Sequence, residues 1–332
     1  MQVRGKVKYC SQCHTKGSCR GCFAKYVHTK VVKRMDTFRG KYNPDAPRPI
    51  YLLPLSFGVS STTLLSVLDF HLKGQMEKSG RPGYDLHVLH VDTSSSGDDG
   101  GDSGAHLLEA VKERFPGHTY STVLLEDNLR ASPEIATEAD PSSEGVSPDK
   151  AKLQQLLSET TNPTARLDVL QNLLRSRIQT FATSNSISTI LYSHSTTRLA
   201  EKTLSLTAKG LGSQLPLEIN DSSSPSSSAI NPNSNNSTTE ATTPQSQYPL
   251  RDVLTKEITL YAETSDPPLT SLIRQRKSAR STVVSAKNMT IDELVRQYFE
   301  TVERDYPSIV ANVVRTTGKL QMPPTGSSDS AL

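Results

Sequence analysis

Residues 55–63 read Leu55-Ser56-Phe57-Gly58-Val59-Ser60-Ser61-Thr62-Thr63, and this stretch decides the fold of the chain. The apolar run Ile50–Leu55 leads into it, and an apolar-periodic segment, Leu64–Leu72, follows it. This order predicts a strand, a tight Ser/Gly turn and the first turn of a helix. Such a turn points backbone N–H groups and the positive end of the helix dipole at one spot, which favours a phosphate.

Four residues of the turn are candidates for a phosphate-binding loop: Ser56, Gly58, Ser60 and Ser61. Glycine lets the backbone approach phosphate oxygens, and serine hydroxyls add donors. Phe57 places a bulky side chain where a small one is expected, and no lysine lies in the loop, which excludes the P-loop NTPase pattern. The alternative is an ordinary strand–helix turn that binds nothing.

Strands and helices alternate after this turn. The pattern predicts strands at Ile50–Leu55, Leu86–Val91, Thr119–Glu126 and Ile187–Tyr192. It predicts helices at Ser61–Lys78, Ala105–Phe115, Thr197–Ala208 and Thr290–Asp305, and a longer helix that begins at Asn162. Such alternation indicates an α/β fold with a parallel sheet and helices on both faces. Ligands of these sheets bind at the carboxyl ends of the strands.

Composition divides the chain further. Hydrophobic residues make up 34% and aromatic residues 5%, low values that indicate substantial loop or disorder. No apolar run approaches the ~20 residues that span a bilayer, and no signal segment is visible, so we expect a soluble, cytoplasmic protein. The predicted parts are a basic Cys-rich segment at 1–48, the first part of the α/β domain at 49–218, a disordered low-complexity insertion at 219–247, the rest of the domain with C-terminal helices at 248–318, and a flexible tail at 319–332.

The N-terminal segment is strongly basic. Residues 1–48 hold 12 Lys and Arg against two acids, whereas the remainder of the chain sums to −7. This asymmetry favours a polyanion partner such as nucleic acid, although a solvated basic helix face is the alternative. The candidate contacts to nucleic-acid phosphates are Arg20, Lys25, Lys30, Lys33, Arg34, Arg39 and Lys41.

All four cysteines lie in the same segment, as Cys10, Cys13, Cys19 and Cys22. Two C-x2-C pairs predict a zinc knuckle, because four thiolates suit tetrahedral Zn²⁺. Reduced, redox-labile thiols are the alternative. The spacer of five residues between the pairs is short.

The turn resembles the Ser-Gly-Gly-x-Asp-Ser signature of the PP-loop ATP pyrophosphatases, which belong to the adenine nucleotide alpha hydrolase-like folds. Phe57 replaces the first glycine and Ser60 the aspartate. The segment from Ser193 to Lys202 resembles the second motif, Gly-His-Asn-x-Asp-Asp-x-Ala-Glu-Thr, with Thr197 and Arg198 in place of its two acids. Because carboxylates hold the Mg²⁺ that triphosphate chemistry needs, the resemblance implies a degenerate site at which ATP binding is doubtful.

The wider pattern resembles the cytoplasmic tRNA 2-thiolation protein 2 family. The matching motifs are the two Cys pairs with the basic run behind them, the turn at residues 55–61, Tyr248-Pro249-Leu250-Arg251-Asp252, Tyr306-Pro307-Ser308 and Val313-Val314-Arg315-Thr316. The resemblance implies a non-catalytic subunit in a heterodimer with a catalytic PP-loop subunit.

The complex implied by this resemblance transfers sulfur from a thiocarboxylated ubiquitin-related modifier to position 2 of the wobble uridine (mcm5s2U) in tRNAs for Lys, Glu and Gln. The alternative is that this chain is itself an ATP-dependent tRNA sulfurtransferase with a diverged loop.

Overall fold

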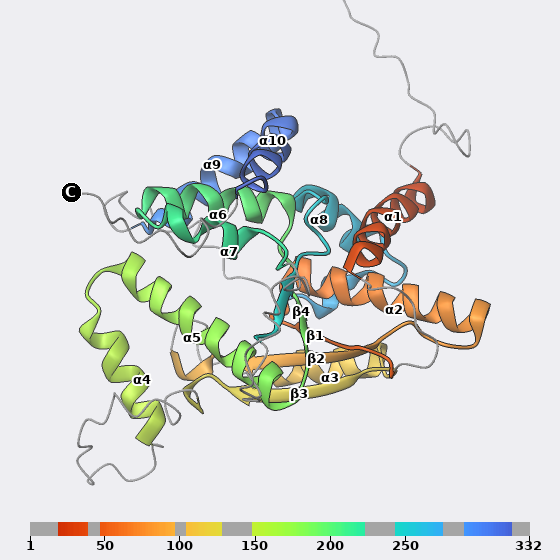
Figure 1. Ribbon diagram of the computed structural model, residues 1–332, viewed down its shortest axis with the longest axis horizontal. Helices are drawn as coiled ribbons and strands as arrows, with labels where there is room; N and C mark the ends of the chain where they lie inside the picture. The colour runs from red at the N-terminus through yellow and green to blue at the C-terminus, as the bar shows by residue number, and fades with distance from the viewer. Residues whose placement is uncertain are drawn as a thin grey trace, which may run out of the picture.

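A five-stranded parallel sheet forms the centre of the molecule (Figure 1). The structure, a computed structural model, describes residues 19–38, 47–96, 104–127, 148–222, 243–274 and 289–320. The strands are β1 (Ile50–Pro54), β2 (Asp85–Asp92), β3 (Thr119–Leu124), β4 (Thr189–Leu191) and β5 (Gln245–Gln247), in the spatial order β3-β2-β1-β4-β5. The predicted α/β fold with a parallel sheet is therefore confirmed.

Helices cover both faces of this sheet. They are α1 (Arg20–Phe38), α2 (Val59–Ser79), α3 (Ala105–Arg114), α4 (Pro148–Glu159), α5 (Pro163–Ser184), α6 (Thr196–Ala208), α7 (Leu215–Ile219), α8 (Thr255–Thr264), α9 (Ile291–Asp305) and α10 (Pro307–Thr317). Successive strand residues point to opposite faces, so Leu53 joins the core under α2, α3 and α8, whereas Leu52 joins the core under α4 and α5.

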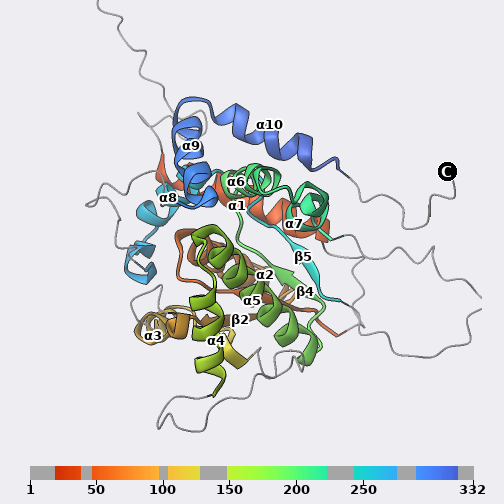
Figure 2. The same cartoon turned by 90° about the vertical axis from the view of Figure 1, so that its left-hand side faces the viewer.

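A third apolar cluster lies beyond α6 and holds the C-terminal helices. Leu199 of α6 and Ile219 of α7 pack with Val295 of α9 and Val310 of α10. Figures 1 and 2 show α9 and α10 as an outer layer above α6. Thr290, at which the sequence predicts this helix to begin, caps α9, because its side chain accepts a hydrogen bond from the backbone N–H of Glu293 at 3.1 Å. The C-terminal helices are thus docked on the α/β domain.

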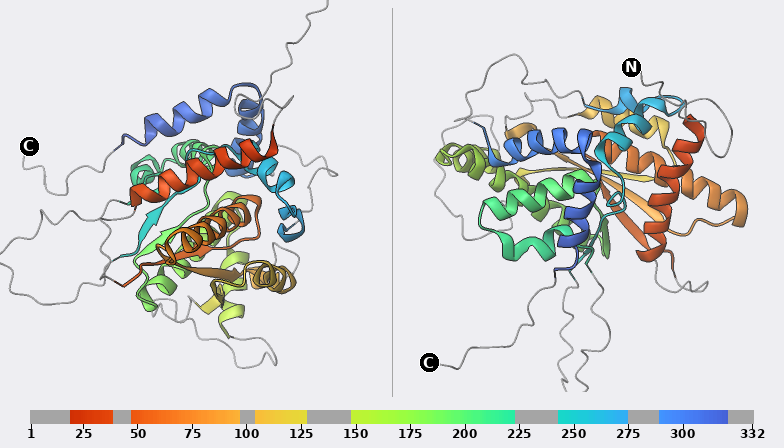
Figure 3. Two further views of the ribbon diagram at one scale, coloured as in Figure 1. Left: turned by 90° about the vertical axis from the view of Figure 1, so that its right-hand side faces the viewer. Right: turned by 90° about the horizontal axis from the view of Figure 1, so that it is seen from above.

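Helix α1, in the predicted N-terminal segment, packs into the core of the α/β domain. Val27, Val31 and Met35 lie along one side of α1, are fully buried, and belong to the core beneath α2 and α8. In Figure 3, left, α1 runs between α2 and α10. Residues spaced by four fall on one helix face, and burying this apolar stripe attaches α1 to the domain.

The predicted insertion also has a different boundary. Its last residues, Gln245–Gln247, form β5 and pair with β4, although their polar composition suggested disorder. Residues 223–242 of the insertion and the predicted tail from residue 321 lie outside the described residues. Within the described ranges, no helix combines the length and apolar character needed to cross a membrane.

Candidate functional site

The carboxyl ends of β1 and β4 lie side by side, at the point where the strand order reverses. Ligands of open α/β sheets bind at such a point. The turn after β1 contains the four predicted loop residues: Ser56 is exposed, Gly58 is the N-cap of α2, Ser60 is half-buried, and Ser61 is buried. The Ser61 hydroxyl donates to the Gly58 carbonyl at 3.1 Å, so this hydroxyl is engaged within the turn.

Phe57 occupies the centre of this turn in an unusual conformation. Its φ of 55° lies in the left-handed region that favours glycine, and its side chain is fully buried. The ring centroid lies 4.6 Å from that of His90, and a Cβ added to Gly104 would lie 2.9 Å from Phe57 Cε2. The Arg274 backbone N–H donates to the Phe57 carbonyl at 2.8 Å. The turn therefore keeps a glycine-type backbone while an aromatic ring fills the adjacent space.

The second turn, after β4, uses its polar side chains to hold the fold. The Ser195 hydroxyl caps α6 by accepting from the Arg198 N–H at 3.0 Å. The Thr197 hydroxyl accepts from the Thr255 N–H at 3.1 Å. Arg198 forms an ion pair with Glu201 at 2.9 Å, and burial raises the pKa of Glu201 although this arginine opposes the shift. The two positions at which the motif carries acids thus hold an engaged hydroxyl and a cation.

His194, in the same turn, packs against two aromatic rings that also stack on each other. Its ring centroid is 5.8 Å from that of Tyr192 and 5.5 Å from that of Tyr248, and both pairs are stacked. Burial, followed by the charges of Lys202 and Arg198, holds the pKa of His194 well below its usual value. This imidazole is therefore neutral at pH 7, and its Nδ1 has no hydrogen-bond partner among the described residues.

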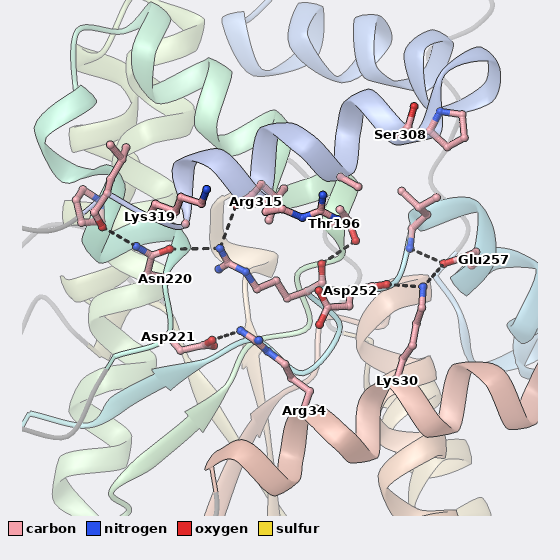
Figure 4. A pocket seen from close by; sticks show the side chains of 18 of the residues that line it. Lys30, Arg34, Thr196, Asn220, Asp221, Asp252, Glu257, Ser308, Arg315 and Lys319 are labelled. Atoms are coloured by element: carbon pink, nitrogen blue, oxygen red, sulfur yellow. Dashed lines mark hydrogen bonds and ion pairs between the residues drawn. The ribbon is translucent and has the colours of Figure 1, made fainter.

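A large cavity lies elsewhere, between α1 and α10. We call it the α1–α10 groove; its volume is about 1270 Å³, and its walls come from α1, α10, residues 216–222 and residues 251–257. Figure 4 shows Lys30 and Arg34 rising from α1, Arg315 on α10 and Lys319 just beyond the end of that helix. Arg251 also lines the groove. The groove therefore gathers five cations from three separate parts of the chain.

Ion pairs and hydrogen bonds fix the floor of the groove. Arg34 pairs with Asp221, and the Arg251 guanidinium donates to the carbonyls of Ile219 and Val314. Burial raises the pKa of Asp221, although the charge of Arg34 opposes this, and burial lowers the pKa of Arg251. Arg251 thus joins the end of α7 to α10 and sets the distance across the groove.

The predicted tRNA-binding residues divide into two groups. Arg20, Lys25 and Lys33 are exposed on α1, whereas Lys30 and Arg34 make ion pairs with acids of the domain. Arg39 and Lys41 lie outside the described residues.

Two of the four predicted metal ligands are visible. Cys19 precedes α1 and Cys22 lies in its first turn; both are half-buried and neither forms a disulfide. Residues three apart at a helix start lie on one side, as two ligands of one ion must. Cys10 and Cys13 fall outside the described residues, and within the described ones no group of three potential metal ligands occurs.

Sequence reasoning missed the groove. It did not single out Asp221, Lys319 or the role of Arg251, because these residues come together only through the packing of α7, β5 and α10. The one available signal was the pair of motifs Tyr248-Pro249-Leu250-Arg251-Asp252 and Val313-Val314-Arg315-Thr316, each of which supplies a groove cation.

Comparison with known proteins gives consistent matches. A family model described as cytoplasmic tRNA 2-thiolation protein 2 matches residues 290–331. A protein of that name from Phaeosphaeria nodorum is 42% identical over 319 residues, which cover 94% of this chain and 77% of the relative. Its namesake from Pyrenophora tritici-repentis is 38% identical over 314 residues, with coverages of 94% and 77%.

Among solved structures, the U34-tRNA thiolase NcsA from Methanococcus maripaludis, with its 4Fe-4S cluster, matches with a TM-score of 0.59 and 16% sequence identity. The match covers 93% of this chain and 85% of that chain. At this identity the likeness concerns the fold.

Proposed function

Because this chain belongs to the cytoplasmic tRNA 2-thiolation protein 2 family, we propose that it serves in the 2-thiolation of the wobble uridine of tRNA. Family membership confirms the resemblance inferred from the motifs. The likeness of its fold to that of a U34-tRNA thiolase is consistent with this role. The substrates would be the tRNAs for Lys, Glu and Gln, and the location the cytoplasm.

The proposed role is that of a non-catalytic subunit, and one observation carries it. The switch-point turns present Phe57, Ser60, Thr197 and Arg198 where an adenylating site needs a glycine and three carboxylates. The Phe57 ring fills the space beside the strand ends, the buried Thr197 hydroxyl is engaged by the Thr255 N–H, and Arg198 is paired with Glu201. A cation at an expected Mg²⁺ ligand position repels the metal, so triphosphate chemistry is assigned to a partner.

The partner proposed here is a catalytic PP-loop subunit that forms a heterodimer with this chain. That complex would take its sulfur from a thiocarboxylated ubiquitin-related modifier. The basic residues exposed on α1, Arg20, Lys25 and Lys33, support the further proposal that this chain binds tRNA, since phosphate contacts need unpaired cations.

A structural Zn²⁺ is proposed at the four cysteines. The visible donors fit, because Cys19 and Cys22 are unoxidised thiols held on one side of the first turn of α1. Zinc would fix the start of α1 through these two residues, while Val27, Val31 and Met35 fix the rest of the helix by burial.

The direct experiment compares cells with and without the gene, measuring 2-thiolated wobble uridine by mass spectrometry of purified tRNA. We expect thiolation to disappear on deletion and to return with the wild-type chain. The purified chain alone is then assayed for ATP–pyrophosphate exchange, with its co-purified complex as the positive control. Exchange by the chain alone would establish the alternative, a sulfurtransferase in its own right, and unchanged thiolation after deletion would refute the proposed function.

A further inference from the structure

We propose that the α1–α10 groove binds the phosphate backbone of an RNA strand, with Arg315 of α10 and Lys319, just after that helix, contacting phosphates opposite the basic side of α1. This inference rests on the proposed function for the identity of the RNA, which is a tRNA. It adds the cations Arg315 and Lys319 on the opposite side of the groove to the basic residues of the N-terminal segment. Its basis is the division of the groove cations into engaged and available ones.

The inner cations are already engaged. Lys30 pairs with Glu257 at 3.6 Å and donates to the Asp252 carbonyl at 2.7 Å. Arg34 is held by Asp221, and Arg251 by backbone carbonyls. These contacts hold α1, the loop after β5 and α10 in fixed positions, so the inner cations shape the groove rather than bind at its mouth.

The outer cations are available. Arg315 and Lys319 are exposed, and within the described ranges no carboxylate lies within ion-pair distance of either. The hydrogen bond that Arg315 makes to a side chain in these ranges goes to Asn312 Oδ1, at 3.3 Å. Lys33 is exposed on α1 two helical turns from the groove-lining Tyr26, on the same side of that helix, although it is not itself a lining residue. Of the acids that line the groove, Asp221 and Glu257 are paired with Arg34 and Lys30, which leaves the exposed Asp252 to oppose Arg315 and Lys319.

The dimensions favour a polymer over a small anion. The groove, at about 1270 Å³, exceeds the roughly 300–1000 Å³ typical of small-molecule sites. The α1 residues that line the groove run from Tyr26 to Arg34, a length of roughly 12 Å at about 1.5 Å per residue. A wall of this length, faced by Arg315 and Lys319, suits a strand that carries one charge at each nucleotide.

An aromatic side chain in the wall favours RNA over an acidic peptide. Tyr26 is 42% exposed, with Lys30 Nζ 4.4 Å from its ring centroid. Its hydroxyl donates to Glu257 at 2.9 Å, which fixes the ring in place. Proteins that bind single-stranded nucleic acid combine a basic groove with an aromatic ring on which an unpaired base stacks.

The test uses the full chain, alone and in its complex, with an unmodified tRNA(Lys) transcript as the probe. Binding is measured over a salt titration for Arg315→Ala/Lys319→Ala and for a control pair, Lys78→Ala/Lys112→Ala, on α2 and α3. Both pairs lower the net charge by two, and thermal melting checks that the variants are folded. We expect the groove pair to lose roughly tenfold in affinity near 0.15 M salt, and the slope of log affinity against log salt to fall by about 1.4–1.8. The control pair should keep the wild-type slope.

A second pair of variants separates stacking from charge. Tyr26→Leu should weaken binding at least roughly fivefold with an unchanged salt slope, because stacking involves no counterion release. Tyr298→Leu is the control, since Tyr298 is 56% exposed on α9 and lies outside the groove lining. Equal affinities for the two variants would remove the base-stacking part of the proposal.

Footprinting gives a readout that needs no variant. Acylation of lysines in the wild-type chain, read by mass spectrometry, should show that tRNA protects Lys319 and Lys33 but not Lys78 or Lys112. The inference is overturned if the groove pair binds as the control pair does, or if a partner protein protects Lys319 and tRNA does not. If tRNA binding requires Lys25 and Lys33 but not Arg315 and Lys319, RNA binding in the groove is excluded while the proposed function stands. The proposed function itself is refuted by a different result, intact tRNA thiolation after deletion of the gene.

Discussion

At Phe57, in the turn after β1, we expect the stability difference between a glycine and an alanine variant to have the opposite sign to the usual one. Phe57 has a φ of 55° and a fully buried ring, so two effects act at one position. Replacing it by alanine removes the ring and keeps a Cβ in the left-handed region. Replacing it by glycine removes the ring and also relieves the backbone. We expect Phe57→Gly to be the more stable of the two variants, whereas glycine is normally the less stable choice.

The magnitude follows from three contributions. Loss of the buried ring costs both variants about 3–5 kcal/mol of unfolding free energy. The left-handed conformation costs a residue with a Cβ about 1–2 kcal/mol, which only glycine avoids. The larger conformational freedom of glycine in the unfolded chain offsets about 0.4–1 kcal/mol of this advantage of the glycine variant. Phe57→Gly should therefore exceed Phe57→Ala in stability by about 0.5–1 kcal/mol.

Urea unfolding followed by circular dichroism measures this difference, with midpoints compared at equal slopes. The matched control is Phe299, which is 3% exposed inside the regular helix α9. There Phe299→Gly should be less stable than Phe299→Ala by about 1 kcal/mol, the ordinary helix-interior penalty. If alanine equals or exceeds glycine at position 57, the argument that the turn keeps a glycine-type backbone under strain is wrong.

Further predictions concern the anchor of α9 and the cysteines. Lys209, with a side chain only 8% exposed, contacts Asp168 at 2.6 Å and Asp292 at 2.5 Å, so Lys209→Met should cost about 3 kcal/mol in urea unfolding by leaving carboxylates unpaired. Burial is the largest single influence on the pKa of Asp292 and raises it, but the hydrogen bonds from Lys209 and Ser205 and the charges of Lys209 and Arg198 together outweigh burial and lower that pKa. The stabilisation is therefore complete above about pH 4 and is lost as pH falls through the folded pKa. Lys209→Met should reduce this acid dependence. Cys19→Ser and Cys22→Ser should each reduce the zinc measured by elemental mass spectrometry below the one ion per chain expected for the wild type, and an unchanged zinc content would exclude the proposed site.

Local patterns in the sequence predict a large part of the fold. An apolar run followed by a Ser/Gly turn and a helical period predicts β1 and α2, and the structure places them at Ile50–Pro54 and Val59–Ser79. The N-cap at Thr290 and the proline-led start of α5 at Pro163 are also visible, because capping depends on residues next to one another in the chain. The presence of Thr197 and Arg198 in place of the two acids of the motif can also be recognised from the sequence without the structure.

Tertiary structure alone decides which cations remain available to a ligand. In the sequence, Lys30, Lys33 and Arg34 are equivalent members of one basic run, yet Lys30 meets the Asp252 carbonyl 222 positions away and Arg34 meets Asp221 across 187 positions. Such pairings depend on the order of the strands and on the stripe that buries α1, neither of which a local pattern specifies. Charge is therefore a property of the sequence, whereas the availability of a charge depends on which distant backbone and side-chain groups the fold brings beside it.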